Sequence, residues 1–330
     1  MGLVLSPRRQ PEKAVAALAA LYVLAALALP WFGSAPVNPI RALAGYEPDR
    51  LIFMELRIPR TLLALLVGGC LGTAGAVLQA LLRESLATPY TLGIASGASF
   101  AVALATAAGV DYWAGLPVSW LAALAGAAAV TALVAGLGRS GGRMSSLRML
   151  LAGISLNAVF SAATLAVIGS AREHRSISVT QWLIGSIDAV RPAAVGALAA
   201  VGGAGLTVLV KQARDLNLIA MGEEWAATRG ANPRRVLLTG FIIGSVLTAS
   251  AVSLAGPIGF VGLIVPHLVR GLLSADHRIL LPCSFLGGGL LLALADALAR
   301  TLTAPAELPT GAVMAFIGGP YLIWMIWRRF

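Results

Sequence analysis

The side chains that most often carry out chemistry are few and scattered in this sequence. The only two lysines, Lys13 and Lys211, lie outside any G-x-x-x-x-G-K-[ST] pattern, so the chain has no P-loop of its own. His174, His267 and His277 are far apart, and no group of histidines, cysteines and carboxylates has metal-ligand spacing. We therefore expect no catalytic activity, metal or cofactor on this chain, and we interpret His267 as a packed or interfacial histidine.

Ionisable groups within the apolar segments are also scarce. Asp296 lies near one end of such a segment, four residues before Arg300. This spacing suits an ion pair on a helix surface, so we interpret the pair as structural. Ion-coupled carriers usually place ionisable groups at mid-membrane depth. This sequence has few such groups, so it does not favour an ion-driven mechanism. Cys70 and Cys283 both lie in apolar runs and are expected to be small core residues.

The composition is that of a polytopic membrane protein. Of the 330 residues, 58% are hydrophobic and 12% are charged, whereas a soluble domain carries about 25% charged residues. Since each helical span needs roughly 20 apolar residues, ten spans would leave only short loops. The sequence therefore predicts a single all-α transmembrane domain over residues 1–330. The net charge of +10 comes from basic residues in loops between apolar runs, which favours contact with membrane lipid and not with nucleic acid.

Ten spans can be placed along the chain, and the third and eighth are short and interrupted by glycine or proline. With the N-terminus in the cytoplasm, 16 of the 24 basic residues fall on the cytoplasmic side and eight outside, in agreement with the positive-inside rule. Both termini are then predicted to be cytoplasmic. The predicted spans are 14–32, 60–82, 90–109, 118–137, 148–169, 192–210, 234–254, 257–274, 279–299 and 308–327.

Two features of this layout have alternatives. The apolar run 14–29 follows three basic residues and could be a signal peptide, but Trp31 lies where an interfacial aromatic residue belongs, which favours a retained span. Pro59-Arg60 opens the second span and Pro233-Arg234 the seventh, so helices 2–5 and 7–10 could form an inverted repeat. Chance similarity between helices rich in alanine and glycine is the alternative. The Gly-Pro break in 256–267 must be buried or face water.

A polar segment, Lys211–Arg235, interrupts the apolar sequence and is predicted to be cytoplasmic. It contains five of the basic and three of the acidic residues. Gly222–Arg229 has the pattern of one short helix, with two glutamates in its first turn and Gly230 available for a left-handed cap. Asn232 is expected to cap the next helix, with Pro233 at its first position. A short helix held outside the bilayer suggests a surface that another protein binds.

Several of these segments, in order, resemble one known family. The chain is similar to the permease subunit of type II ATP-binding-cassette importers, the FecCD type, which carries iron–siderophores, haem and cobalamin. One departure is that the usual Asn-Pro-Leu-Ala of the family reads Glu84-Ser85-Leu86-Ala87 here. The segments that carry the resemblance are 57–79, 87–100, 148–162, 221–235, 256–270 and 306–324.

The resemblance implies a homodimer in the bacterial inner membrane, with ten helices per subunit and a pathway along the two-fold axis. It also implies two cytoplasmic ATPase subunits that bind ATP and magnesium, and a substrate-binding protein that docks from outside. The substrate would be an iron chelate, either a ferric siderophore or haem, and cobalamin is the alternative within the same machinery. An ion-coupled secondary carrier that acts alone is the competing function, and a passive channel or scaffold fits the polar segment poorly.

The resemblance also implies roles for particular residues, each with a simpler alternative. The coupling segment could instead be a solvated loop, the outer arginines could extend to lipid headgroups, and the polar stripe of the fifth span could bond neighbouring helices. The implied coupling residues are Leu218, Met221, Gly222, Glu223, Glu224, Trp225, Arg229, Gly230, Arg234 and Arg235. The implied docking residues are Arg57, Arg60 and Arg300, the pathway residues Ile154, Asn157, Ser161 and Thr164, and the cytoplasmic gate residues Ser145, Ser146 and Leu147.

Overall fold

The computed structural model describes residues 11–34, 37–110, 112–113, 116–140, 143–144, 146–170, 180 and 182–329. Within these residues the regular secondary structure is helical apart from two antiparallel hairpins of two-residue strands, and the predicted all-α fold class is confirmed. One hairpin pairs β1 (Tyr112–Trp113) with β2 (Leu116–Pro117), and the other pairs β3 (Arg139–Ser140) with β4 (Arg143–Met144).

Eight helical segments in the described part of the chain are long and apolar enough to cross a membrane. They comprise α1 (Pro11–Ala28) with the short η1 (Leu29–Trp31), η2 (Leu51–Arg57) with α3 (Ile58–Leu82), α5 (Val118–Leu137), α6 (Ser146–Ser170), α8 (Pro192–Lys211), α11 (Pro233–Ala255), α13 (His277–Thr301) and α14 (Thr310–Arg329). The other helices that we describe are α2 (Pro39–Ala44), α4 (Ile94–Ala108), α9 (Ala213–Met221), α10 (Glu223–Thr228) and α12 (Val261–Leu272).

The two short apolar helices, α4 and α12, coincide with the predicted third and eighth spans. Each begins after a residue with left-handed backbone, Gly93 at φ 71° and Phe260 at φ 68°, so the chain enters both helices from irregular backbone. The Gly-Pro break before α12 was predicted to be buried or to face water: Gly256 is buried, and Pro257 is partly buried and lines a cavity. That all ten segments cross the membrane, and that both termini are cytoplasmic, remain predictions.

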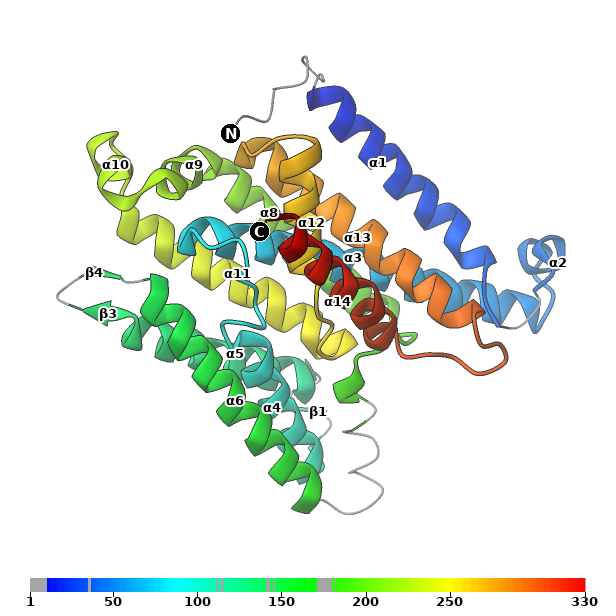
Figure 1. Cartoon of the computed structure of the whole chain (residues 1–330). Coiled ribbons are helices and arrows are strands. Elements are labelled where there is room, and N and C mark those ends of the chain that lie inside the picture. Colours follow the sequence, from blue (N-terminus) through cyan, green and yellow to red (C-terminus); the bar gives the residue numbers. More distant parts are fainter. Residues whose placement is uncertain are drawn as a thin grey trace.

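Helix α3 forms the centre of the molecule and is buried along most of its length (Figure 1). Its most extensive interface is with α13, and α11, α12 and α8 pack around it. Glycines bring the α3 and α13 backbones together, because a Cβ at Gly68 would overlap the Gly288 carbonyl oxygen and a Cβ at Gly288 would overlap that of Gly68. The two helices therefore form a tightly packed pair.

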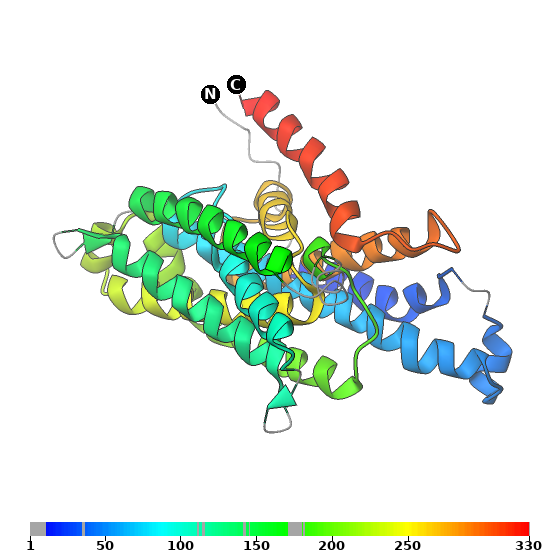
Figure 2. The same cartoon turned by 90° about the horizontal axis from the view of Figure 1, so that it is seen from below.

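The polar segments gather at two opposite ends of the molecule. Helices α9 and α10 and the β3–β4 hairpin lie at one end, whereas α2 and the loop 302–309 lie at the other (Figures 1 and 2). We call these the α10 end and the α2 end. Between them, Cys70 and Cys283 are free and buried, so their prediction as core residues is confirmed.

Candidate translocation and coupling sites

At the α2 end, a single buried carboxylate joins three helices. Asp296 on α13 is fully buried and forms an ion pair with Arg60 of α3 at 3.0 Å and another with Arg300 of its own helix at 3.0 Å. The hydroxyl of Thr310, the first residue of α14, donates to the same carboxylate at 3.0 Å. These contacts fix the ends of α3, α13 and α14 against one another.

The sequence prediction for Asp296 was correct in its partner but wrong in its location. The four-residue spacing does produce an ion pair with Arg300, yet the pair is buried and not on a helix surface. Sequence spacing reports only neighbours on the same helix, and here α3 and α14 cover the pair. A carboxylate within an apolar span, with arginines at the ends of other spans, was the signal for a buried cluster.

Arg60 binds a second carboxylate that sequence reasoning missed. Its Nη1 donates to Glu307 in the loop 302–309 at 2.7 Å, and Ser34 also donates to Glu307 at 3.2 Å. Burial raises the pKa of Glu307, but the hydrogen bond and charge of Arg60 outweigh burial and bring that pKa below its ordinary value of 4.5. Glu307 is therefore a carboxylate at neutral pH.

The other two predicted docking residues, Arg57 and Arg300, are more buried than surface docking residues would be. Arg57 donates to the carbonyl oxygens of Pro30 and Trp31 at 3.4 Å, and Arg300 donates to that of Phe32 at 3.2 Å. Both arginines thus hold the end of η1 and the residue that follows it.

The three arginines and Glu307 nevertheless line one cavity of about 380 Å³ at the α2 end. Its wall also contains Gly33. We call it the arginine cavity. Three guanidinium groups face two carboxylates, Asp296 and Glu307, so the cluster has an excess of positive charge.

At the α10 end, the predicted short helix is confirmed. Helix α10 has Glu223 and Glu224 in its first turn, and Gly230 after it has the predicted left-handed backbone at φ 83°. The side chain of Asn232 caps α11 by accepting from the Arg235 N–H at 3.1 Å.

Helix α9 was not predicted. Its polar residues resemble a loop, but Ala213, Leu216 and Ile219 recur every three residues and form its buried face. That period was the available signal.

Among the predicted coupling residues, two apolar side chains face outward. Met221 is 67% exposed and Trp225 is 53% exposed, and the Arg229 guanidinium lies 5.0 Å from the centre of the Trp225 ring. Leu218 instead packs against the core. A hollow beside Trp225 is lined by Arg83, Gly222, Glu223, Glu224, Ala227 and Pro233.

Three of the four predicted pathway residues lie around one polar cavity of about 400 Å³. Asn157, Ser161 and Thr164 of α6 contribute to its wall, whereas Ile154 is half-exposed and is not in the wall. The remaining wall residues that we describe, none of them charged, are Tyr90, Ser96, Ser99, Leu165, Leu183 and Pro257.

Sequence reasoning missed the contribution of α4 to this cavity. Ser96 and Ser99 are three residues apart on that short helix, which was the available signal. Of the predicted gate residues, Ser145 lies outside the described residues, Ser146 begins α6, and Leu147 is 65% exposed.

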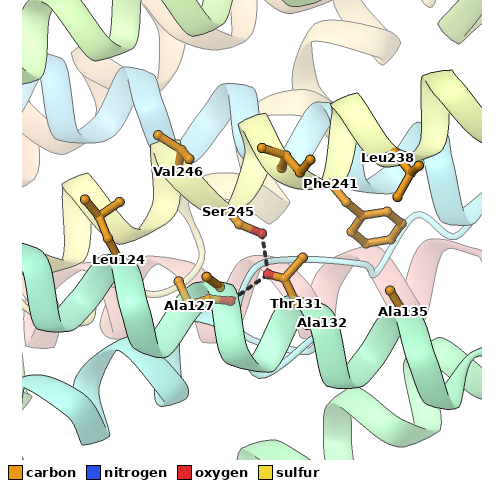
Figure 3. A pocket seen from close by; sticks show the side chains of 11 residues that line it. Leu124, Ala127, Thr131, Ala132, Ala135, Leu238, Phe241, Ser245 and Val246 are labelled. Carbon is orange, nitrogen blue, oxygen red and sulfur yellow. Dashed lines mark hydrogen bonds between the residues drawn. The ribbon is translucent and has the colours of Figure 1, made fainter.

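A second, apolar cavity of about 250 Å³ lies between α5 and α11 (Figure 3). Thr131 and Ser245 point toward each other across it and share a 2.6 Å hydrogen bond, so both hydroxyls are satisfied. Aliphatic and aromatic side chains such as Leu238 and Phe241 form most of its wall. This cavity has no charged or unpaired polar group in its described wall, and we assign it no role in translocation.

Comparison with known proteins agrees with this arrangement. The chain is 38% identical over 283 residues to the hemin transport system permease protein HmuU of Yersinia pestis, which covers 84% of each protein. It is 36% identical over 318 residues to the Fe(3+) dicitrate transport system permease protein FecC of Escherichia coli, covering 94% of this chain and 96% of that one. A solved inward-facing structure of a metal-chelate type ABC transporter matches with a TM-score of 0.83 and 29% identity, covering 96% of this chain and 99% of the other.

The fold and these similarities define a membrane-embedded transport subunit, the permease of an ABC importer, with several passes through the bacterial inner membrane. The model of the FecCD transport family matches residues 18–328, nearly the whole chain. The chain belongs to the FecCD transport family.

Proposed function

We propose that this permease carries an iron chelate, either a ferric siderophore or haem, into the cell at the expense of ATP hydrolysed by partner subunits. The observation that carries this proposal is the separation of two sites: an exposed aromatic anchor at the α10 end and a cationic cavity at the α2 end. The permease works as a homodimer with two ATPase subunits and a substrate-binding protein, and ATP and magnesium are held by the ATPases.

The segment 211–235 is the coupling site for the ATPase. Trp225 and Met221 offer apolar area to a groove on the partner, and exposed aromatic residues commonly dominate such contacts. The Arg229 guanidinium over the Trp225 ring restricts the orientation of that ring before the partner binds. The hollow beside Trp225 gives the partner a shaped surface rather than a flat one.

The arginine cavity is the docking site for the binding protein. An acidic side chain on that protein can enter the cavity and meet guanidinium groups, whose pairing with a carboxylate gives register as well as attraction. Glu307 occupies one position on Arg60 when no partner is present, so docking exchanges an internal carboxylate for an external one.

The polar cavity beside α6 belongs to the translocation pathway. Its hydroxyl and amide groups offer neutral hydrogen bonds, and no charge in its described wall would hold an ionic ligand tightly. Such a wall lets a large ligand pass without stable binding.

The substrate class rests on the relatives, whose names refer to hemin and ferric dicitrate. Both are iron bound in an organic ligand, which favours an iron chelate. Cobalamin import by the same machinery is the second candidate, because the motifs are shared across the family.

Uptake into proteoliposomes tests this function. Vesicles that contain the permease with its ATPase, supplied with binding protein and radiolabelled ferric siderophore, haem or cobalamin, should accumulate one iron chelate only when ATP is enclosed with the ATPase. Uptake by the permease alone, driven by an ion gradient, would show a secondary carrier and contradict the proposal. Accumulation of cobalamin alone would retain the machinery and change the substrate.

A further inference from the structure

Helix α9 is attached to the first turn of α13 by one side chain. The Asn217 Nδ2 donates to Asp276 at 2.8 Å, and its Oδ1 accepts from the backbone N–H of His277 at 3.0 Å and lies 2.6 Å from the Nδ1 of the same residue. Asp276 also caps α13 by accepting from the Arg278 N–H at 2.9 Å. Asn217 therefore satisfies the donors and acceptors of a helix end that belongs to another part of the chain.

The opposite end of α13 forms part of the arginine cavity. Asp296 and Arg300 lie in its last turns, and Asp296 binds Arg60 at the start of α3. Arg60 on α3 and Arg300 on α13 both line the cavity, and three further wall residues lie on η2, which leads directly into α3.

The α3–α13 pair is closely packed between its two ends. At Gly72 a Cβ would overlap the Ser284 carbonyl oxygen, and at Gly289 it would overlap that of Leu65. Backbone contact of this kind leaves no compressible side-chain layer, so a displacement of one helix end is carried along the pair. The C-terminal end of α3 also reaches the coupling segment, since Arg83, which follows α3, lines the same hollow as Trp225.

A second polar contact attaches α9 elsewhere and provides a comparison. The Thr239 hydroxyl of α11 donates to Gln212, the residue before α9, at 2.8 Å. Helix α11 contributes no residue to the wall of the arginine cavity. The two contacts therefore join α9 to different helices, of which only α13 carries residues of the cavity.

We propose that Asn217 is the joint through which the coupling segment moves the α3–α13 pair, and that this pair connects the ATPase surface to the docking cavity for the binding protein. Asn217 acts as a positioning residue: it touches neither partner and transmits the position of α9 to the start of α13. This inference rests on the proposed function, since it assumes an ATPase at the α10 end and a binding protein at the α2 end.

Linkage between the two partners tests the joint. The affinity of the assembled complex for the binding protein is measured with and without a non-hydrolysable ATP analogue, and the ratio of the two is the coupling factor. Coupling between sites typically changes affinity by about 5- to 150-fold, and the effect is reciprocal. Asn217→Ala should bring the factor close to one while affinity without nucleotide is unchanged. The isosteric Asn217→Asp, which loses the donor to Asp276 and brings two carboxylates together, should do the same.

Thr239→Val is the matched control, because it removes the hydrogen bond between α11 and Gln212, the residue before α9, and keeps the side-chain shape. It should retain the wild-type coupling factor. Three results would contradict the proposed role of Asn217. They are a coupling factor of one in the wild type, an unchanged coupling factor in both Asn217 variants, and an equal loss of coupling in Thr239→Val. Failure of the proposed function is distinguishable, because the binding protein or the ATPase would then not bind the wild-type permease at all.

Discussion

Arg60 binds two carboxylates at once, and they differ in what they can do. Asp296 is fully buried and shared among three helices, so it serves the fold. Glu307 lies on a loop, and its side chain is 38% exposed, so it can leave Arg60 without opening the core. Because Glu307 can be displaced, Arg60 is the arginine whose ion pairing a docked protein can change at the lowest cost in free energy.

If a carboxylate of the binding protein replaces Glu307 on Arg60, substitutions at these two residues should change the affinity in opposite directions. Glu307→Gln should increase the affinity for the binding protein by up to about fivefold. The partly exposed ion pair between Arg60 and Glu307 contributes about 0.2–1 kcal/mol, and without it no internal carboxylate competes for Arg60. Arg60→Glu should weaken binding, and titration of the binding protein into the purified complex at low salt measures both. Glu55→Gln, at an exposed acid on η2, is the control and should have no effect. Weaker binding in Glu307→Gln would mean that Glu307 supports docking.

Trp225 carries the second residue-scale prediction. Trp225→Ala should lower the affinity for the ATPase subunit by about 30-fold or more, since loss of a central aromatic anchor costs about 2 kcal/mol or more of binding free energy. The same substitution should uncouple ATP hydrolysis from transport. Trp225→Phe should retain most of the affinity because it keeps the apolar area. Co-purification and transport assays give the result. Normal transport in Trp225→Ala would remove this residue from the coupling surface.

At this scale, the sequence predicted which arginines lie together better than it predicted their surroundings. Arg57, Arg60 and Arg300 were grouped correctly at one end of the molecule, because their positions relative to the apolar spans could be counted. Their partners could not be foreseen, since Asp296 and Glu307 reach Arg60 from sites more than 200 residues away in the chain. Contacts between distant segments are set by tertiary packing, which local spacing does not report.

Among the elements, the long helices were predictable and the irregular joins between them were not. Helix α5 has the predicted bounds of 118–137, because an uninterrupted apolar run has only one way to cross a bilayer. Helix α9 was missed because tertiary burial, and not propensity, selects its apolar face. Helices α4 and α12 are shorter than predicted because buried irregular backbone precedes each of them.

The tight packing of α3 against α13 should make this pair sensitive to a single added methyl group. Gly288→Ala should destabilise the permease by about 1–3 kcal/mol, because the new methyl group would overlap the Gly68 carbonyl oxygen and the two backbones would have to separate. Thermal unfolding in detergent measures the change. Gly203→Ala on α8 is the control, because nothing lies within 4 Å of its new methyl group. Equal melting temperatures for the two variants would show that the pair is not tightly packed.

For the molecule as a whole, the proposed function requires that the α10 end and the α2 end face opposite sides of the membrane. Two arguments support this predicted polarity: basic residues are in excess on one side of the predicted layout, and α9 and α10 lie together at one end of the structure. Neither observation identifies the substrate. The polar cavity is neutral and built from common side chains, so its composition does not distinguish one iron chelate from another.

Labelling of single cysteines tests this polarity most directly. Met221→Cys at the α10 end and Leu302→Cys at the α2 end introduce thiols at exposed positions, while Cys70 and Cys283 are buried and serve as the background. In intact spheroplasts, a membrane-impermeant maleimide should label Leu302→Cys at once and Met221→Cys only after permeabilisation. Labelling of Met221→Cys from outside would place the coupling segment away from any cytoplasmic ATPase and contradict the account.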